Sequence, residues 1–332
     1  MRTHTPHQRP RALLLAAAAV AATALAGLPQ SAGAVGTAPA GAAAETTPVG
    51  FGAGTSGGGT AAPVTVSTLA AFKTAVTGDN AKVVKVSGLI PLSGQVDVGS
   101  NTTVLGVGSA SGFTGGGLRV KQETNVVIRN LTITKPVAPA DAITVQKSTK
   151  VWIDHNTFSS DRDHGKDYYD GLVDITHASD YVTVSWNTFK NHYKGSLVGH
   201  SDKNASEDTG HLRVTYHHNH FSDVNSRIPS LRFGTGHFYD NYVEGADTAV
   251  HSRMGAQMLV ENNVFRSTKV AVTTHRDSGT DGYANLRGND LGGAALEVSR
   301  TGSFTTAPYA YTAEPASSVV ASVTAGAGAG RL

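Results

Sequence analysis

A short strand pattern that ends in asparagine recurs through this chain and constrains its fold more than any other feature. The instances are VVIRNLTI (Asn130), VWIDHNTF (Asn156), VTVSWNTF (Asn187), VTYHHNHF (Asn219), GHFYDNYV (Asn241), MLVENNVF (Asn263) and the weaker ANLRGNDL (Asn289). Neighbouring asparagines are 22 to 32 residues apart. A motif repeated at this period marks stacked units that bury their apolar faces only against one another. The sequence therefore predicts an all-β solenoid.

The residues within each repeat favour strands over helices. In VTVSWNTF, apolar Val182, Val184 and Trp186 alternate with polar residues, as expected for a strand. Asparagine tolerates left-handed backbone, and its amide both donates and accepts hydrogen bonds. We therefore expect a stacked asparagine ladder, although independent turns would give the same pattern. Helical spacing occurs mainly in Ser67–Val76, which predicts a short N-terminal capping helix with Ser67 as its N-cap.

The first 34 residues have the parts of a secretory signal peptide. Arg2, Arg9 and Arg11 are positive, the apolar run Ala12–Ala26 follows, and small residues occupy positions 32–34. A membrane anchor is the alternative, but this apolar run is too short to span a bilayer comfortably.

Cleavage of this segment would divide the chain and change its charge. We expect residues 1–34 to be removed, residues 35–46 to form a flexible leader, and residues 47–332 to form one secreted, extracellular and monomeric domain. Loss of three arginines would lower the formal net charge from +2 to −1, which does not suit a nucleic-acid partner. The chain has no cysteine, so packing alone must stabilise the exported domain.

Three acids form a candidate metal site. Asp170 and Asp174 are four residues apart in YYDGLVDIT, a spacing that would place them on one face of a strand. Asp141 precedes an earlier strand, which a solenoid would place about one coil away. Carboxylates from neighbouring coils would suit Ca²⁺, a hard cation that prefers oxygen ligands. Scattered surface acids are the alternative.

Three basic residues form a candidate anion site. Lys194 lies in HYKGSL, and Arg227 and Arg232 flank Pro229 in NSRIPSLRFG. Proline fixes the local backbone, so the two guanidinium groups could be presented rigidly to carboxylates, and lysine would add a movable charge. A solvated basic strand edge would have the same composition.

One repeat contains a histidine cluster that could suggest zinc. His217, His218 and His220 occur together, but alternation would place His217 on the opposite face from the other two. Three converging ligands are therefore not expected, and a stacking role at the turn is favoured.

The motifs around these residues resemble the pectate lyases of polysaccharide lyase family one. The resemblance lies in VGFGAGTSGGG, VWIDHNTFS, DGLVDITHASDYVTVSWNTF, TYHHNHFSDVNSRIPSLRFGTGHFYDNYV and a C-terminal tail similar to that of bacterial members. It covers nearly all of residues 47–332. It implies a right-handed parallel β-helix with three sheets, and an extracellular enzyme that uses Ca²⁺ to cleave polygalacturonate.

The resemblance also implies roles for the candidate residues. Asp170, Asp174 and Asp141 match calcium ligands, Arg227 matches the catalytic base, and Lys194 and Arg232 match residues that bind substrate carboxylates. Some relatives carry a further aspartate two residues before Asp141, where this chain has Pro139. We therefore expect weak calcium binding before substrate arrives.

The implied reaction is β-elimination. Cations on the C5 carboxylate of galacturonate would stabilise the charge that develops as the C5 proton leaves. The bond to the glycosidic oxygen then breaks and leaves a 4,5-unsaturated end. Arginine is ordinarily always protonated, so a basic role for Arg227 predicts an alkaline activity optimum.

Two alternatives remain open from the sequence. A pectin lyase would share the fold and act on methyl-esterified pectin, but the calcium-binding acids argue against it. A non-catalytic polysaccharide-binding solenoid would share the repeat without the chemistry.

Overall fold

The structure is a computed structural model that describes residues 45–332. The predicted signal peptide and most of the predicted leader lie outside these residues. Within the described range, no helix is long and apolar enough to span a membrane.

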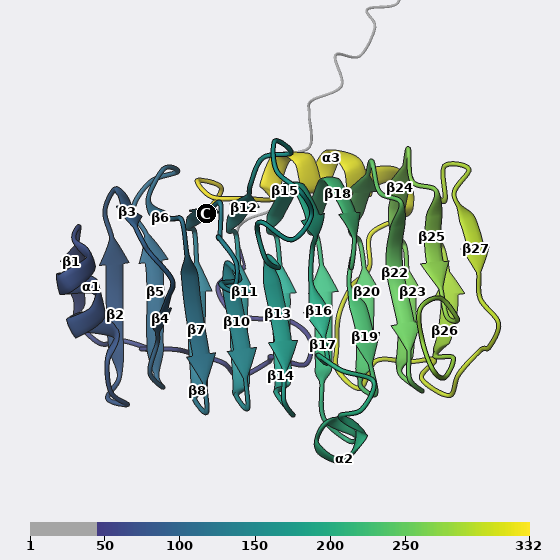
Figure 1. Cartoon of the computed structure of the whole chain (residues 1–332), viewed down its shortest axis with the longest axis horizontal. Helices are drawn as coiled ribbons and strands as arrows, with labels where there is room; N and C mark the ends of the chain where they lie inside the picture. The colour runs from purple at the N-terminus through teal and green to yellow at the C-terminus, as the bar shows by residue number, and fades with distance from the viewer. Residues whose placement is uncertain (1–44) are drawn as a thin grey trace, which may run out of the picture. The chain divides into compact units, whose positions relative to one another are not determined.

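The strands of the described residues form three parallel sheets, in which each strand pairs with its equivalent in the next coil (Figure 1). Sheet A has ten strands: β1 (Pro63–Val66), β2 (Lys82–Val86), β5 (Thr102–Gly106), β8 (Thr124–Arg129), β11 (Thr149–Asp154), β14 (Asp180–Ser185), β17 (Arg213–His217), β20 (Thr235–Tyr239), β23 (Gln257–Glu261) and β26 (Tyr283–Arg287). Sheet B has eight: β3 (Leu89–Pro91), β6 (Gly112–Thr114), β9 (Thr132–Thr134), β12 (Thr157–Ser159), β15 (Thr188–Lys194), β18 (His220–Ser226), β21 (Tyr242–Glu244) and β24 (Val264–Arg266). Sheet C has nine: β4 (Gln95–Asp97), β7 (Gly117–Lys121), β10 (Ile143–Gln146), β13 (Val173–Thr176), β16 (Leu197–Val198), β19 (Ser230–Arg232), β22 (Thr248–Arg253), β25 (Val270–Thr273) and β27 (Ala295–Glu297). The predicted three-sheet parallel solenoid is confirmed.

Side chains that point inward fill the solenoid in stacked rows. Phe158, Phe189 and Phe221 occupy equivalent places in sheet B and are fully buried, with ring centroids 5.0 and 4.5 Å apart. Val182 and Val184 of β14 are also fully buried, as their alternation predicts. The core is therefore continuous from coil to coil, and every coil depends on its neighbours for burial.

The asparagine ladder forms at the corner between sheets A and B. Side-chain hydrogen bonds of 2.9–3.0 Å link Asn156, Asn187, Asn219, Asn241, Asn263 and Asn289 in order. Asn130 departs from the pattern, because Arg129 pairs with Asp154 and Asn130 therefore aligns with His155, one position before the ladder. Its φ is +58°, and its Oδ1 accepts the backbone N–H of Gly330 at 2.6 Å. Inside the ladder, each amide satisfies polar groups that the fold buries.

The left-handed residue at this corner is not the ladder asparagine but the one before it. His155, Trp186, His218, Asp240 and Asn262 have φ between +51° and +54°. This conformation ends the alternation of each strand one residue earlier than the sequence pattern indicates. Trp186 is thereby turned outward, where a Cβ on Gly326 of the C-terminal segment would meet its ring.

The short helix near the N-terminus is α1 (Leu69–Val76), which lies beside β1 (Figure 1). Its N-cap is Thr68, whose Oγ1 accepts the N–H of Ala71 at 3.3 Å, so the prediction of Ser67 was wrong by one residue. Phe72 and Val76 are fully buried, and Phe72 packs against Phe113 of β6 with ring centroids 4.7 Å apart.

The ends of the described chain pack on the outside of the coils. The remaining helices are α2 (Ala205–Asp208) and α3 (Ala316–Gly326). Val319 and Val323 of α3 contact Tyr242 of β21 and Val264 of β24, both in sheet B. At the other end, Gly52 donates its backbone N–H to Thr183 Oγ1 at 3.0 Å, which attaches the N-terminal segment to sheet A.

Candidate active site

Two of the predicted calcium ligands lie on neighbouring coils of sheet C. Asp174 is in β13, where it pairs with Thr144 of β10, and Asp141 lies three residues before Thr144. Each of the two aspartates is only 8% exposed. The expectation that Asp141 lies one coil from Asp174 is confirmed.

Asp170 reaches the same region by another route. The strand argument for Asp170 and Asp174 was wrong, because β13 begins only at Val173 and Asp170 belongs to the loop before it. The Asp170 carboxylate is 3.3 Å from Lys194 Nζ. His192 lies beside the same loop, with its Nε2 2.5 Å from the Asp170 carbonyl oxygen.

The backbone of Gly171 passes close to both buried carboxylates. A Cβ at this position would lie 2.5 Å from Asp174 Oδ1 and 2.9 Å from Asp141 Oδ1. Instead, the Gly171 N–H donates to Asp141 Oδ1 at 2.9 Å, and Asp174 Oδ1 accepts the N–H of Leu197 at 3.1 Å. Only glycine therefore allows the backbone to approach both carboxylate oxygens at this position.

Burial and mutual repulsion make these carboxyl groups easier to protonate. Burial raises the pKa of Asp141 to about 6, and the charge of Asp170 contributes in the same direction. Burial also raises the pKa of Asp174 well above its usual value, with the charge of Asp141 adding to the effect. A bound cation would favour the charged form of both carboxyl groups and so lower both pKa values.

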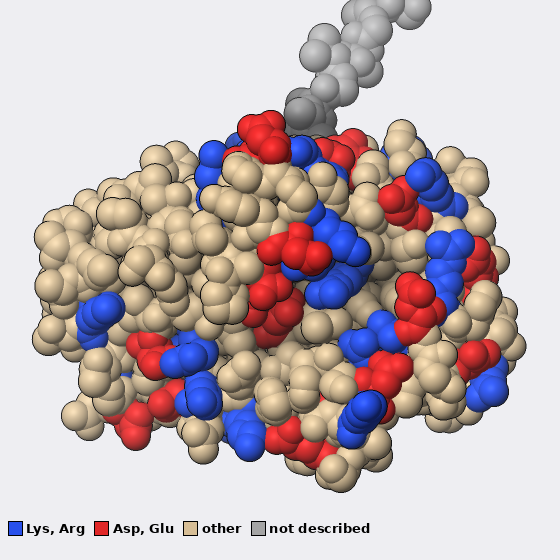
Figure 2. All heavy atoms as spheres, viewed as in Figure 1, with Lys and Arg blue, Asp and Glu red and all other residues tan. Residues whose placement is uncertain are grey.

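A basic groove of about 430 Å³ lies beside the acids, lined by the loop before β13, the ends of β15 and β18, residues of β19 and β22, and the turn after β25. Its basic lining residues are Lys166, Lys194, Arg227, Arg253 and Arg276. In Figure 2, blue and red spheres gather at the centre of the visible face. Within residues 45–332 the Arg227 guanidinium makes no hydrogen bond or ion pair, and its positive charge acts on Asp174. The groove therefore presents cations to an anionic ligand.

Arg232 is not among the residues that line this groove. Its Nε is 2.5 Å from Asp202 Oδ1, and its Nη1 donates to the Gly199 carbonyl at 2.7 Å. The structure thus brings Lys194 and Arg227 together but holds the buried Arg232 in an ion pair with the partly exposed Asp202.

Arg253 is a groove residue that the sequence reasoning missed. It pairs with Arg232 across β19 and β22, and its Nη2 lies 3.3 Å from Asp202 Oδ1. The signal was present, because HSR (251–253) follows SLR (230–232) by 21 residues, about one coil. Burial and the neighbouring Arg232 charge lower the pKa of Arg253.

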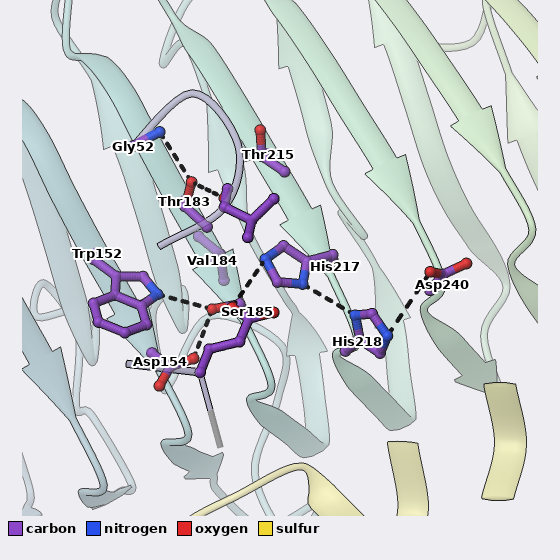
Figure 3. A network of polar contacts seen from close by, with 12 residues as sticks. Gly52, Trp152, Asp154, Thr183, Val184, Ser185, Thr215, His217, His218 and Asp240 are labelled. Atoms are coloured by element: carbon purple, nitrogen blue, oxygen red, sulfur yellow. Dashed lines mark hydrogen bonds and ion pairs between the residues drawn. The ribbon is translucent and has the colours of Figure 1, made fainter. Parts of the chain in front are cut away.

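A second polar cluster lies on the outside of sheet A (Figure 3). His217 and His218 meet there, with 3.0 Å between their Nδ1 atoms, because the left-handed backbone at His218 turns its side chain. The expectation that they lie on opposite faces was therefore wrong. His220 stays apart and lies 3.0 Å from Glu244.

Neither cluster holds a complete ligand set for a metal. In the part of the chain that the structure describes, no group of three or more histidine, cysteine or acidic side chains is arranged to bind one. In the candidate active site the reason is clear, since Asp170 turns towards Lys194 and leaves Asp141 and Asp174 as a pair.

Comparison with known proteins identifies the family of this chain. The sequence model described as pectate lyase matches residues 12–332. The chain belongs to the pectate lyase family. A probable pectate lyase A from Aspergillus fumigatus is 52% identical over 261 residues, covering 78% of this chain and 80% of the relative. Pectate lyase A from Aspergillus niger is 50% identical over 265 residues, covering 79% and 80%.

Solved structures of the family share the fold. A pectate lyase from Bacillus sp. N165, in complex with trigalacturonate, is 34% identical with a TM-score of 0.79 and covers 86% of this chain and 99% of its own. Pectate lyase II from Xanthomonas campestris is 30% identical with a TM-score of 0.74, covering 86% and 98%. The similar proteins thus include both fungal and bacterial enzymes.

Proposed function

We propose that this chain is a secreted, calcium-dependent pectate lyase that cleaves α-1,4-polygalacturonate by β-elimination. The observation that carries the proposal is the juxtaposition of two buried carboxylates with a groove lined by Lys194, Arg227 and Arg253. Family membership, and the trigalacturonate bound by a relative, support the choice of polymer.

The donor set fits calcium. Asp141 and Asp174 offer hard oxygen donors on either side of the Gly171 backbone, and rotation of Asp170 away from Lys194 would add a third. Because this third carboxylate is paired with a cation, we propose that calcium binds weakly until a substrate carboxylate joins it. Bound calcium would supply positive charge to the substrate carboxylate, which stabilises negative charge in the transition state.

The basic residues would take different roles, in proton transfer and in binding of substrate carboxylates. Arg227 would take the C5 proton, since its guanidinium has no partner among the described residues and faces the groove. Lys194 would bind a substrate carboxylate once Asp170 releases it. Arg232 would reach a carboxylate only if its pair with Asp202 opened, so we propose that it also positions Arg253 through the shared Asp202.

Two finer features of the solenoid belong to the same proposal. We propose a right-handed path, since parallel crossover connections are right-handed in nearly all proteins. We also propose that α1 caps the N-terminal coil, because Phe72 and Val76 cover the core beside β1.

The test is the ultraviolet absorbance of unsaturated uronides during incubation with polygalacturonate at alkaline pH, with calcium or with chelator. We expect absorbance to rise, chelator to stop it and calcium to restore it. A rise in absorbance that chelator does not change, and that is larger on fully methylated pectin, would indicate a pectin lyase. Flat traces under all conditions would indicate a non-catalytic binder.

A further inference from the structure

A second groove lies over coils of sheet C that are nearer the N-terminus than the basic groove. It has a volume of about 660 Å³ and is lined by Leu92, Ser93, Gly94, Gln95, Gly115, Arg119, Val137, Ala138, Pro139 and Ala140. Gly115 and Ala140 of this groove, like Lys194 and Arg227 of the basic groove, precede strands of sheet C, so the two grooves share the edge where these parallel strands begin. The basic groove also extends across the sheet to Arg276, beyond the end of β25.

The two grooves adjoin the candidate calcium residues from opposite sides. Ala140 precedes Asp141 directly, and Gln95 donates from Nε2 to the Asp141 carbonyl oxygen at 3.3 Å. Strands β7 and β16 are three steps apart in sheet C, or about 14 Å at the usual strand spacing. A polymer lying across the strands would therefore contact both grooves.

The second groove is formed by a loop that the backbone holds in place. The Ala138 N–H donates to the Tyr168 carbonyl at 3.0 Å, and the Ala140 N–H donates to the Val137 carbonyl at 3.0 Å. The Val137 side chain remains exposed and faces solvent at 40% of its area. The groove thus has an apolar rim that does not depend on a bound ligand.

Its charge differs from that of the basic groove. Arg119 is the only charged lining residue, and Asp97 pairs with it through two bonds of 2.5 and 2.9 Å. The basic groove has five cationic lining residues against two aspartates. Figure 2 shows the same asymmetry, since the upper surface over the N-terminal coils is largely tan while charges crowd the centre.

We propose that this second groove binds a methyl-esterified galacturonate unit of the polymer, so that the enzyme accepts partly esterified pectin. The inference rests on the proposed function. A free galacturonate would find no unpaired cation among the groove's lining residues, whereas the methyl ester, its uncharged form, would place its methyl group against Val137 and Pro139. Free carboxylates remain necessary at the basic groove. The two grooves would therefore recognise different forms of galacturonate, the free acid at one and the methyl ester at the other.

The test compares initial rates on polygalacturonate and on randomly half-esterified pectin at saturating calcium. Val137→Lys adds a cation at the rim, and Asp97→Asn frees Arg119 from its partner. Each change is expected to lower the ratio of the pectin rate to the polygalacturonate rate about three- to fivefold, the scale of one partly exposed charge interaction. Val107→Lys is the matched control, because Val107 is 45% exposed and lines neither groove, and its ratio should equal that of the wild type.

Product analysis gives a second readout. Mass spectrometry of the unsaturated oligomers should find methyl esters at a fixed distance on one side of the cleaved bond. Random ester positions, or ratios in both variants equal to that of Val107→Lys, would overturn the groove assignment while leaving the lyase intact. Wild-type protein that releases no unsaturated product from either substrate would overturn the proposed function and this inference together.

Discussion

The asparagine ladder and the acidic pair are both rows of buried polar side chains, but they are satisfied in different ways. Asn219 donates from Nδ2 to Val184 O, His217 O and Asn241 Oδ1 at 2.9–3.1 Å, and its own Oδ1 accepts from Asn187. Asp141 accepts the Gly171 N–H and the Thr144 hydroxyl, Asp174 accepts the Leu197 N–H, and the charge of Asp141 raises the pKa of Asp174. The first row is therefore satisfied within the protein, whereas a bound cation would stabilise the second.

This contrast separates polar groups that support the fold from those that serve function. A buried amide that bonds within the protein stabilises the folded state, because the unfolded chain makes equivalent bonds only with water. Two buried carboxylates without a counterion oppose folding. The acidic pair is thus retained at a cost in stability, which is expected of a site that must bind an ion and a substrate.

The largest expected effect lies beside the acids. Replacing Arg227→Lys should lower the elimination rate by about 10²- to 10⁴-fold, the usual contribution of a positioned proton acceptor. The fold should be unchanged, because the Arg227 guanidinium has no partner among the described residues. The measurement is kcat on polygalacturonate, with circular dichroism as the check on folding. Arg266→Lys, which alters an exposed ion pair with Asp290, is the control and should keep full activity. A variant at Arg227 with wild-type kcat would remove this residue from the chemistry.

Exchanging an amide for a carboxylate in the ladder should have the next largest effect. Asn219→Asp removes both Nδ2 hydrogens, which are shared among three acceptors, and buries a charge, so the free energy of unfolding should fall by about 3–5 kcal/mol. Urea denaturation measures this change. Asn289→Asp, at the partly exposed end of the ladder, should cost less. Equal losses at both positions would show that the ladder does not act as a buried network.

The reverse exchange in the acidic pair should have the opposite sign. In the absence of calcium, Asp174→Asn should raise the free energy of unfolding by about 1–2 kcal/mol, because it removes a buried charge that repels Asp141. The same variant should need more calcium for activity. Thermal unfolding with chelator measures the first effect, and calcium titration of the rate measures the second. A calcium-free variant less stable than the wild type would mean that Asp174 supports the fold, as the asparagines do.

The sequence predicted the ladder well because one residue type recurs at a nearly constant place in each coil. It predicted Asp141 and Asp174 one coil apart for the same reason. The prediction that His217 and His218 lie on opposite faces was wrong, because the backbone leaves the strand at His218. The left-handed conformation there turns His218 towards His217. The sequence reasoning also missed Arg253, whose role depends on the strand register that sets it beside Arg232.

Charge pairing could not be read from the sequence at all. Arg232 and Lys194 look alike as basic residues near a cleft, but only the fold shows that Asp202 holds the first and that Asp170 approaches the second. The distances between such groups depend on loops whose conformations no periodic pattern specifies.

The polar cluster outside sheet A provides a third case, in which buried carboxyl groups have neither a ladder nor a calcium ion. Burial raises the pKa of Asp240 to about 8 and that of Glu45 to about 7. One Asp240 oxygen accepts the Glu314 N–H at 2.9 Å, and the other has no partner among the described residues. We expect Asp240 and Glu45 to remain protonated, because burial disfavours the charged form.

Because Asp240 and Glu45 are expected to be protonated in the folded state, the free energy of unfolding should fall as pH rises. A carboxyl group whose pKa is raised on folding binds its proton more tightly in the folded state, so its contribution is fully present below about pH 4 and is lost through about pH 8. The buried histidines, Asp141 and Asp174 are the same in the wild type and in the variant, so the difference between the two pH slopes isolates Asp240. Asp240→Asn should therefore remove about 1 kcal/mol of the decline between pH 7 and pH 9, measured by urea denaturation. Asp247→Asn is the control, since Lys269 lowers the pKa of Asp247 and that group does not titrate in this range. If Asp240→Asn kept the wild-type slope, the buried cluster would hold its carboxylates charged, and its resemblance to the calcium-free acidic pair would fail.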